Sequence, residues 1–296
     1  MTRGEFLRSA GALATLSVTG CAFDSVSESE LVRRRFAALQ AGVDEVTPED
    51  FKAYLARQEE PTNWLGVRQG KAALLQLDDA FEKVQKEAQK TVVTKNPAVW
   101  FVYGMGIVVK TAESLFSVDL MHRHAPELVP SLDFALVTRN DAGHVTSAFR
   151  EAMLRANKPV VGRFKGGKIA AMTKIRDVEI HMGQADMDER LVDAATTFEI
   201  RIGKYVIYHT GDCCSAAKLN PSVQPDLWIV NPCCGLKLAW GVRKFHPLLT
   251  AIGHLNELGS PRGKGRWTWQ DGLRSAAEVE SAGERAVVPL WGERIL

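Results

Sequence analysis

The chain has 296 residues, with 37 Lys and Arg against 35 Asp and Glu, which gives a net charge of +2. This near balance gives no reason to expect a nucleic-acid groove or a basic membrane-binding patch. With 46% hydrophobic and 24% charged residues, the composition is that of a folded globular protein and excludes a disordered chain.

The first 21 residues have the layout of an export signal. Arg3 and Arg8 come first, and a run of small and apolar residues follows from Ala10 to Thr19. The run ends in Val18-Thr19-Gly20-Cys21, which resembles the signal of bacterial lipoproteins, where small residues precede a cysteine that becomes the lipid-bearing N-terminus. The resemblance implies an exported protein that a lipid on Cys21 anchors to the membrane of the cell envelope. The alternative is an apolar N-terminus kept on a cytoplasmic protein.

Residues 28–92 are predicted to form a helical extension packed on the main domain. Thr47-Pro48-Glu49-Asp50 is typical of a helix start, with a hydroxyl cap, a proline in the first turn and acidic residues beside the helix dipole. A second helix is expected from about Lys71 to Lys90, since apolar residues recur there on one side. Nothing in this stretch indicates chemistry.

From residue 95 to 296 we expect the main domain, because short apolar strands separated by turns replace the helical pattern. The expected strands cover 99–103, 106–110, 115–119, 134–138, 160–161, 198–202, 205–208, 227–230 and 248–252, and helices are expected at 145–156 and about 271–282. Hairpins come first and strands interleaved with helices follow, which predicts a layered α/β architecture.

Four of these strands are followed by loops that carry His, Asp or Cys. The loops read Asn140-Asp141-Ala142-Gly143-His144, His209-Thr210-Gly211-Asp212-Cys213-Cys214, Asn231-Pro232-Cys233-Cys234-Gly235 and Gly253-His254-Leu255-Asn256-Glu257. Catalytic and metal-binding residues are commonly carried by loops on a rigid scaffold. We therefore expect a metal or catalytic site where these loops meet.

Four stretches, in chain order, carry a resemblance to a known superfamily. They are the opening hairpin with Ser117-Val118-Asp119, Ala135-Leu136-Val137-Thr138-Arg139-Asn140-Asp141-Ala142-Gly143-His144, Ile207-Tyr208-His209-Thr210-Gly211-Asp212 and Ala251-Ile252-Gly253-His254. They resemble the metallo-β-lactamase superfamily, in particular the branch similar to ascorbate-6-phosphate lactonase. The resemblance implies an αββα sandwich with one or two metal ions at one edge between the sheets.

The superfamily's metal-binding motif, H-x-H-x-D-H, is broken in this chain. Its four positions fall on Arg139, Asp141, Gly143 and His144, so only the last residue is kept. A guanidinium stays protonated in proteins, so Arg139 cannot bind a metal and repels one. It is expected near Asp141 and Asp212, where it could replace a cation and satisfy both carboxylates.

The resemblance also assigns the later ligands. Asp212 matches the bridging aspartate and His254 the final histidine, and His181 is the candidate for the middle histidine. The candidate metal ligands are therefore Asp141, His144, His181, Asp212 and His254, with Asp212 and His144 as the catalytic pair.

Two functions stay open at this point. The first is a metal-dependent hydrolase of a small ester, lactone or phosphoester, in which one zinc or manganese ion activates a water molecule. His144, Asp212 and His254 form a workable set of two histidines and one carboxylate for such an ion. The second is an impaired pseudoenzyme or an anion-binding module that has lost its metal and in which Arg139 fills the old site.

Three further groups of residues are expected to have no direct role in metal binding or catalysis. His209 is expected to orient Asp212 without binding the metal, and His122, His124 and His246 are expected to be hydrogen-bonded surface residues. The basic and aromatic run 262–269 is expected to pack its tryptophans and leave its charges solvated, with binding of an anionic substrate as the alternative.

The late cysteines form two adjacent pairs, Cys213-Cys214 and Cys233-Cys234. They are expected to be small loop residues or to form one disulfide between the pairs, which becomes plausible in an exported protein. Soft metal ligation is the alternative.

Overall fold

The computed structural model describes residues 28–56, 70–141, 143–162, 171–186, 194–261 and 266–296. The predicted export signal and Cys21 lie outside these residues, so export and lipid anchoring stay predictions. Within the described ranges, no helix combines the length and the apolar character that a membrane span requires.

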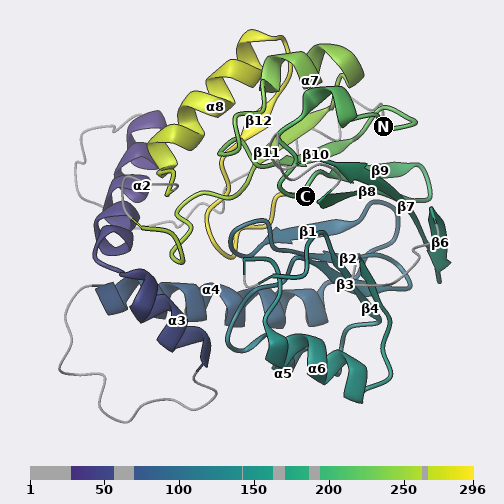
Figure 1. Cartoon of the computed structure of the whole chain (residues 1–296), viewed down its shortest axis with the longest axis horizontal. Helices are drawn as coiled ribbons and strands as arrows, with labels where there is room; N and C mark the ends of the chain where they lie inside the picture. The colour runs from purple at the N-terminus through teal and green to yellow at the C-terminus, as the bar shows by residue number, and fades with distance from the viewer. Residues whose placement is uncertain (1–27, 57–69, 142, 163–170, 187–193, 262–265) are drawn as a thin grey trace, which may run out of the picture.

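Two sheets stack face to face in the middle of the molecule (Figure 1). The first has the strand order β1 (Ala98–Phe101), β2 (Ile107–Lys110), β3 (Leu115–Val118), β4 (Phe134–Val137), β5 (Val160–Gly162). The second has the order β12 (Ala286–Val287), β11 (Leu249–Ile252), β10 (Leu227–Val230), β9 (Tyr205–His209), β8 (Ala195–Ile202), β7 (Val178–Ala185), β6 (Met172–Ile175). Antiparallel hairpins form one half of each sheet and parallel strands the other: β3, β4 and β5 are parallel, as are β9 to β12.

One hydrophobic core fills the space between the two sheets. Alternate strand residues point into it, such as Val99 and Phe101 on β1, because successive side chains of a strand face opposite ways. The rings of Phe116 and Phe134 stack there with centroids 4.6 Å apart. The residue between the β1 pair, Trp100, belongs instead to the core under the helices. Both faces of the inner strands are therefore buried, which explains why these strands are apolar throughout, whereas β6 and β7 keep partly exposed residues.

Helices cover the outer face of each sheet (Figure 1). On the first sheet lie α4 (Gly70–Lys90), α5 (Ala125–Leu128) and α6 (Ser147–Arg155), and on the second lie α7 (Leu238–Phe245) and α8 (Trp269–Ser281). A short 3₁₀ turn spans Ala216–Lys218, and α2 (Glu28–Asp44) and α3 (Pro48–Ala56) lie at one side. The predicted αββα sandwich is confirmed.

Most elements lie where their patterns predicted them, and a few were missed. Thr146 and Thr268 cap α6 and α8 by accepting a backbone N–H, which explains where these helices begin. The helices α5 and α7 and the strands β6, β7 and β12 were not predicted. The predicted helices of residues 28–92 are present, while the division into an extension and a separate domain stays a prediction.

His122 corrects one interpretation, because it is fully buried rather than at the surface. Its ring stacks on Phe81 of α4 at a centroid distance of 4.1 Å, and its Nε2 lies 2.7 Å from the hydroxyl of Tyr54 on α3. Tyr54 also donates to Asp78, which Arg123 holds with two N–H donors at 3.0 and 2.6 Å. This buried polar cluster fastens α3 and α4 to the loop after β3.

Arg266 corrects a second interpretation. It is 7% exposed, and its guanidinium donates to the backbone carbonyls of Val43, Val46, Leu258 and Ser260. Its charge is therefore neither solvated nor turned toward a substrate. It joins the turn between α2 and α3 to the loop after β11.

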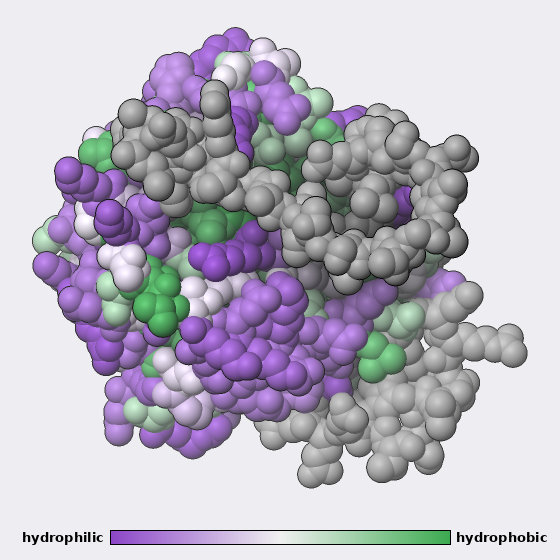
Figure 2. Space-filling model, turned by 180° about the vertical axis from the view of Figure 1, so that it is seen from behind, coloured by the Kyte–Doolittle hydropathy of each residue, from purple (hydrophilic) through white to green (hydrophobic). Residues whose placement is uncertain are grey.

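The molecular face seen in Figure 2 is mainly hydrophilic, with hydrophobic residues in small separate patches. The exposed large hydrophobic residues in the described part of the chain are spread over several elements: Leu75, Val92, Leu154, Met172, Val223 and Trp240. Scattered apolar residues of this kind are usual on folded proteins.

Candidate metal centre

Parallel strands bring the candidate site together at one edge of the sandwich. The strands β9, β10 and β11 run side by side in the same direction, so the residues after each of them meet at one sheet edge. Asp212 follows β9, Asn231 follows β10 and His254 follows β11. His144 reaches the same place from the facing sheet, through the turn between β4 and α6.

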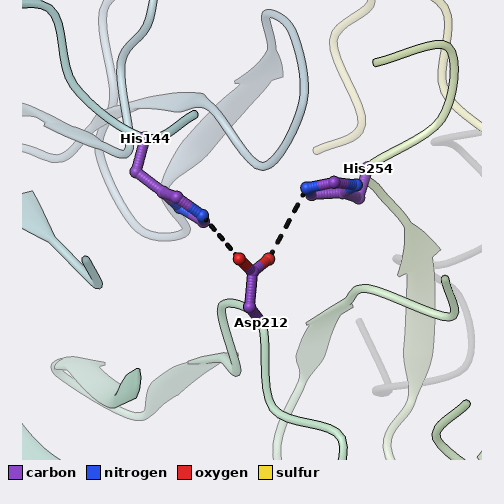
Figure 3. A group of neighbouring side chains, drawn as sticks. All are labelled: His144, Asp212 and His254. Carbon is purple, nitrogen blue, oxygen red and sulfur yellow. Dashed lines mark hydrogen bonds and ion pairs between the residues drawn. The ribbon is translucent and has the colours of Figure 1, made fainter. Parts of the chain in front are cut away.

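His144, Asp212 and His254 point toward one another (Figure 3). Each offers one ligand atom, and these atoms all lie within 4.8 Å of one another. The Nε2 atom of His144 lies 2.8 Å from Oδ2 of Asp212, and Nε2 of His254 lies 3.6 Å from Oδ1 of the same carboxylate. The structure therefore assembles the two histidines and one carboxylate that the sequence predicted for a single metal ion.

Asp119, which the sequence analysis did not assign to the site, holds His144 in place. Its Oδ2 lies 2.9 Å from Nδ1 of His144, and the carboxylate also accepts the backbone N–H and the hydroxyl of Thr138 at 2.7 and 2.5 Å. A carboxylate on Nδ1 leaves Nε2 as the ligand atom and fixes the ring orientation. The sequence did carry a signal for this role. Asp119 comes directly after β3, and β3 is the parallel neighbour of β4, which leads to His144.

His209 holds the backbone turn that leads to Asp212. Its Nε2 lies 2.9 Å from the carbonyl oxygen of Met105, so Nε2 carries the proton and Nδ1 accepts the backbone N–H of Gly211 at 3.3 Å. Gly211 has a φ of +51° and lies against Thr138, where an added Cβ would come within 2.8 Å of that side chain. A glycine is therefore required at the turn that delivers Asp212.

The electrostatics of the site favour a charged pair in the absence of metal. Burial would lower the pKa of His144, but the carboxylates of Asp119 and Asp212 outweigh it and raise that pKa well above its ordinary value. Burial would raise the pKa of Asp212, but His144, His254 and the amide of Asn231 together hold it well below its usual range. Metal binding at Nε2 must displace the proton that His144 shares with Asp212.

Arg139 lies where the sequence predicted, between two carboxylates. Its Nε pairs with Asp141, and its Nη1 lies 3.4 Å from Oδ2 of Asp212. Asp141 also accepts the backbone N–H of Gly143 at 2.9 Å, so it closes the turn before His144. Asp141 lines the same cavity but is not one of the three clustered ligand residues, because Arg139 and this turn engage its carboxylate.

His181 lies apart from the other candidates, which corrects the expectation that it joins them. It stands in the middle of β7, pairs with Glu179 on the same strand, and is opposite Met172 and Glu199 on the neighbouring strands. It is not among the residues that line the cavity described below. A ligand at this edge would have to follow the end of β7 rather than lie three residues into it.

The four late cysteines are free thiols, so the structure contains no bridge between the two pairs. The thiol of Cys233 donates to the carbonyl of His254 and that of Cys234 to the carbonyl of Cys213, at 3.2 and 3.1 Å. Burial raises the pKa values of Cys213 and Cys234 to about 12. Protonated, hydrogen-bonded thiols of this kind are poor nucleophiles and poor metal ligands.

The three clustered residues lie in a cavity of about 1070 Å³. One wall is formed by α6 and the loop before it, including Arg139 and Arg150, and another by α3, including Phe51 and Lys52. Residues 28–92, in which the sequence indicated no chemistry, thus contribute one wall of the cavity through α3. Glu257, also missed by the sequence analysis, lines the same space.

Comparisons with known proteins find similar structures but no similar sequences. No protein-family model matches the chain, and no curated protein matches it. The metallo hydrolase Igni18 from the archaeon Ignicoccus hospitalis matches at a TM-score of 0.51 and 14% identity, over 67% of this chain and 97% of its own. A possible metal-dependent hydrolase from Veillonella parvula matches at 0.53 and 9% identity, over 68% and 99%.

A third structure, the metallo-β-lactamase fold protein YhfI from Bacillus subtilis, matches at a TM-score of 0.49 and 12% identity, over 68% of this chain and 99% of its own. Identities this low show a shared fold alone. The first two similarities agree with the layers and strand orders described above, which confirm the predicted αββα sandwich. The activity has to be argued from the site.

Proposed function

We propose that this chain is a metal-dependent hydrolase of a small ester, lactone or phosphoester. One observation carries the proposal: His144, Asp212 and His254 converge within 4.8 Å of one another in a large cavity at the sheet edge. The two similar structures are named a metallo hydrolase and a possible metal-dependent hydrolase, which supports the same assignment here.

The donor set fits a divalent metal ion. Two imidazoles and one carboxylate, with room for water and substrate, suit zinc or manganese in a catalytic site. When bound, such an ion lowers the pKa of a water molecule toward neutrality and polarises the bond to be cleaved. One ion is proposed rather than two, because Arg139 lies at the position of the first motif histidine.

The chain's own residues have separate tasks in this proposal. Asp119 accepts the Nδ1 proton of His144 and so presents Nε2 to the cavity. Asn231 donates to Oδ1 of Asp212 at 2.8 Å and fixes the direction of that carboxylate. Arg139 and Lys52 place positive charge on the cavity walls, where they would attract and orient an anionic substrate.

The resemblance to the ascorbate-6-phosphate lactonase branch makes the lactone of a phosphorylated sugar acid the first substrate to test. Among the described residues, the cavity walls carry three basic ones that could hold an anionic group, beside four acidic ones: Lys52, Arg139 and Arg150, and Glu49, Asp141, Asp212 and Glu257. A phosphoester and a simple neutral ester complete the panel, and they separate recognition of charge from recognition of the lactone ring.

The proposed function is tested by metal content, melting temperature and turnover. We expect the purified protein to hold about one metal ion per chain and to melt higher with zinc or manganese than after chelation. The variant His254→Ala should lose the bound ion and the metal-dependent rise in melting temperature. If wild-type protein contains no stoichiometric metal, and neither ion changes melting or hydrolysis, the hydrolase proposal is refuted.

The contacts of Arg139 support a second candidate function. Its guanidinium pairs with Asp141 and reaches Asp212, so it partly neutralises carboxylates that a second ion would otherwise hold together. An anion-binding module without catalysis would use this charge directly. Calorimetric binding of inorganic phosphate by the chelated protein, lost in Arg139→Ala, would favour this candidate over hydrolysis.

We also propose that the protein is exported and carries a lipid on Cys21. The support is the signal-like sequence of residues 1–21 alone. Replacing Cys21 by Ser should release the protein from the membrane fraction of a bacterium that expresses it. Recovery of the wild-type protein in the cytosol, with its N-terminus intact, would refute the proposal.

A further inference from the structure

Glu257 places a buried carboxylate beside the three clustered residues. It lies three residues after His254 in the loop that follows β11, and it is 6% exposed. Its Oε1 accepts the hydroxyl proton of Tyr103 at 2.9 Å. Its Oε2 accepts no hydrogen bond from any residue in the described part of the chain.

A buried carboxylate oxygen without a donor lowers the stability of the fold unless a ligand binds it. Burying a carboxylate oxygen without a hydrogen-bond donor removes it from water without compensation. Nε2 of His254 lies 3.8 Å from Oε2 of Glu257. This is the nitrogen that also faces Asp212 at 3.6 Å.

These two separations are too long for hydrogen bonds but suit ligands of one ion. Ligand atoms at about 2.0–2.2 Å from a tetrahedral metal stand roughly 3.3–3.6 Å apart. Oε2 of Glu257 and Oδ1 of Asp212 flank Nε2 of His254 at distances close to this range. Glu257 is not one of the three residues whose ligand atoms all lie within 4.8 Å of one another, so its carboxylate would have to move toward Asp212 and His144 to share one ion with them.

The broken motif lacks a carboxylate that Glu257 could replace. The aspartate position of the motif is Gly143, which has no side chain to offer. Oε2 of Glu257 lies near this segment: a Cβ added to Gly104 would lie 3.3 Å from that oxygen and 4.0 Å from the carbonyl of Gly143. The missing ligand and the uncompensated oxygen therefore belong to the same corner of the site.

We infer that Glu257 is a fourth metal ligand, which replaces the carboxylate lost at Gly143 and is held in position by Tyr103. The inference rests on the proposed metal-dependent function. In the motif, the lost carboxylate belongs to the loop after β4. Its replacement, Glu257, belongs to the loop after β11. Tyr103 is a positioning residue, since its hydroxyl fixes Oε1 and leaves Oε2 to the metal.

The test compares zinc affinity in the wild-type chain, Glu257→Gln and Glu257→Ala, with Glu280→Gln as a matched control on the exposed side of α8. Competition with a chromophoric chelator gives the dissociation constants. We expect both Glu257 variants to bind zinc at least about tenfold more weakly, since even residues outside the ligand set cost that much. The control should match the wild type.

Two readouts separate a ligand from a structural residue. Without metal, Glu257→Gln should melt at the wild-type temperature or higher, because it removes a buried charge. With cobalt in place of zinc, the visible absorption spectrum should change in both Glu257 variants, because the number or type of ligands changes. Adding Gly143→Asp to Glu257→Ala should restore much of the zinc affinity.

The failures of the two proposals are distinguishable. If the wild type binds zinc and the Glu257 variants bind it equally well with the same cobalt spectrum, the inference is overturned and the metal site stands. Weaker zinc binding with an unchanged cobalt spectrum would make Glu257 a positioning residue and also overturn it. If the wild type binds no metal, both proposals fall together.

Discussion

At the scale of single residues, Asp119 shows how the ligand His144 is held. It is 1% exposed and forms three hydrogen bonds, to both donors of Thr138 and to the ring of His144. Asp119 itself is not among the residues that line the cavity. The residue acts on any metal only through the imidazole that it orients.

Replacing Asp119 by Asn should therefore weaken metal binding without removing a ligand. We expect the zinc dissociation constant to rise about 10–100-fold, because an amide is a weaker acceptor for the Nδ1 proton. Chelator competition measures the change, and the melting temperature of the metal-free variant checks that the fold persists. An unchanged dissociation constant in a folded variant would show that Asp119 does not control His144.

Arg139 offers a second prediction at this scale. The variant Arg139→His removes a permanent cation and adds an imidazole beside Asp141 and Asp212. We expect it to take up more than one metal ion per chain, measured by elemental analysis after dialysis. Arg139→Gln is the matched control: it removes the charge without adding an imidazole and should stay at one ion. Equal stoichiometry in all three proteins would count against the placement of Arg139.

At the scale of elements, the attachment of α3 and α4 depends on a buried neutral histidine. Burial, with the nearby cations His124 and Arg123, lowers the pKa of His122 well below its ordinary value. The unfolded chain takes up a proton near pH 6.5, while the folded chain does not. This group therefore costs stability as the pH falls below about 6.5.

His122→Gln should remove that dependence while keeping a polar partner for Tyr54. In the wild type, this group lowers the free energy of unfolding by up to about 1.4 kcal/mol per pH unit below pH 6.5. Urea unfolding at pH 7, 6 and 5 should show a shallower loss in the variant. His246→Gln, at an exposed position, should follow the wild type. Parallel pH profiles for both variants would contradict the argument.

At the scale of the whole molecule, the helices of residues 28–92 form part of the core. Leu77, Phe81 and Val84 of α4 are nearly or fully buried and share one cluster with Trp100 of β1. The indole nitrogen of Trp100 donates to Glu87 on α4 at 2.8 Å. Removing α4 would expose the outer face of the first sheet.

A chain that begins at residue 95 should consequently fail to fold. We expect it to lack a cooperative melting transition and to bind a hydrophobic dye, because the apolar surface under α4 has lost its cover. The single substitution Phe81→Ala should cost about 3–5 kcal/mol in the full chain. A truncated chain that melts cooperatively would show that residues 28–92 are a separable extension.

The sequence by itself determined the elements and the loops that carry the site. Short apolar runs, helix caps and turns are short-range signals, and the apolar runs between turns placed β1, β4, β9, β10 and β11 correctly. The missed strand β7 also carries a period of two, in Val178, Glu179 and Ile180, so its signal was present. The convergence of His144, Asp212 and His254 was predicted from the resemblance to the superfamily and from the loops that follow the strands.

Only the tertiary structure decided which side chains share the site. His181 and Glu257 both follow or lie within strands of the second sheet, yet His181 lies in the middle of β7, whereas Glu257 lies beside His254 in the loop after β11. The contact of Glu257 with Tyr103 and the wall that α3 adds to the cavity depend on how distant segments face each other. Such contacts arise from packing between segments far apart in sequence, which no local pattern of residues encodes.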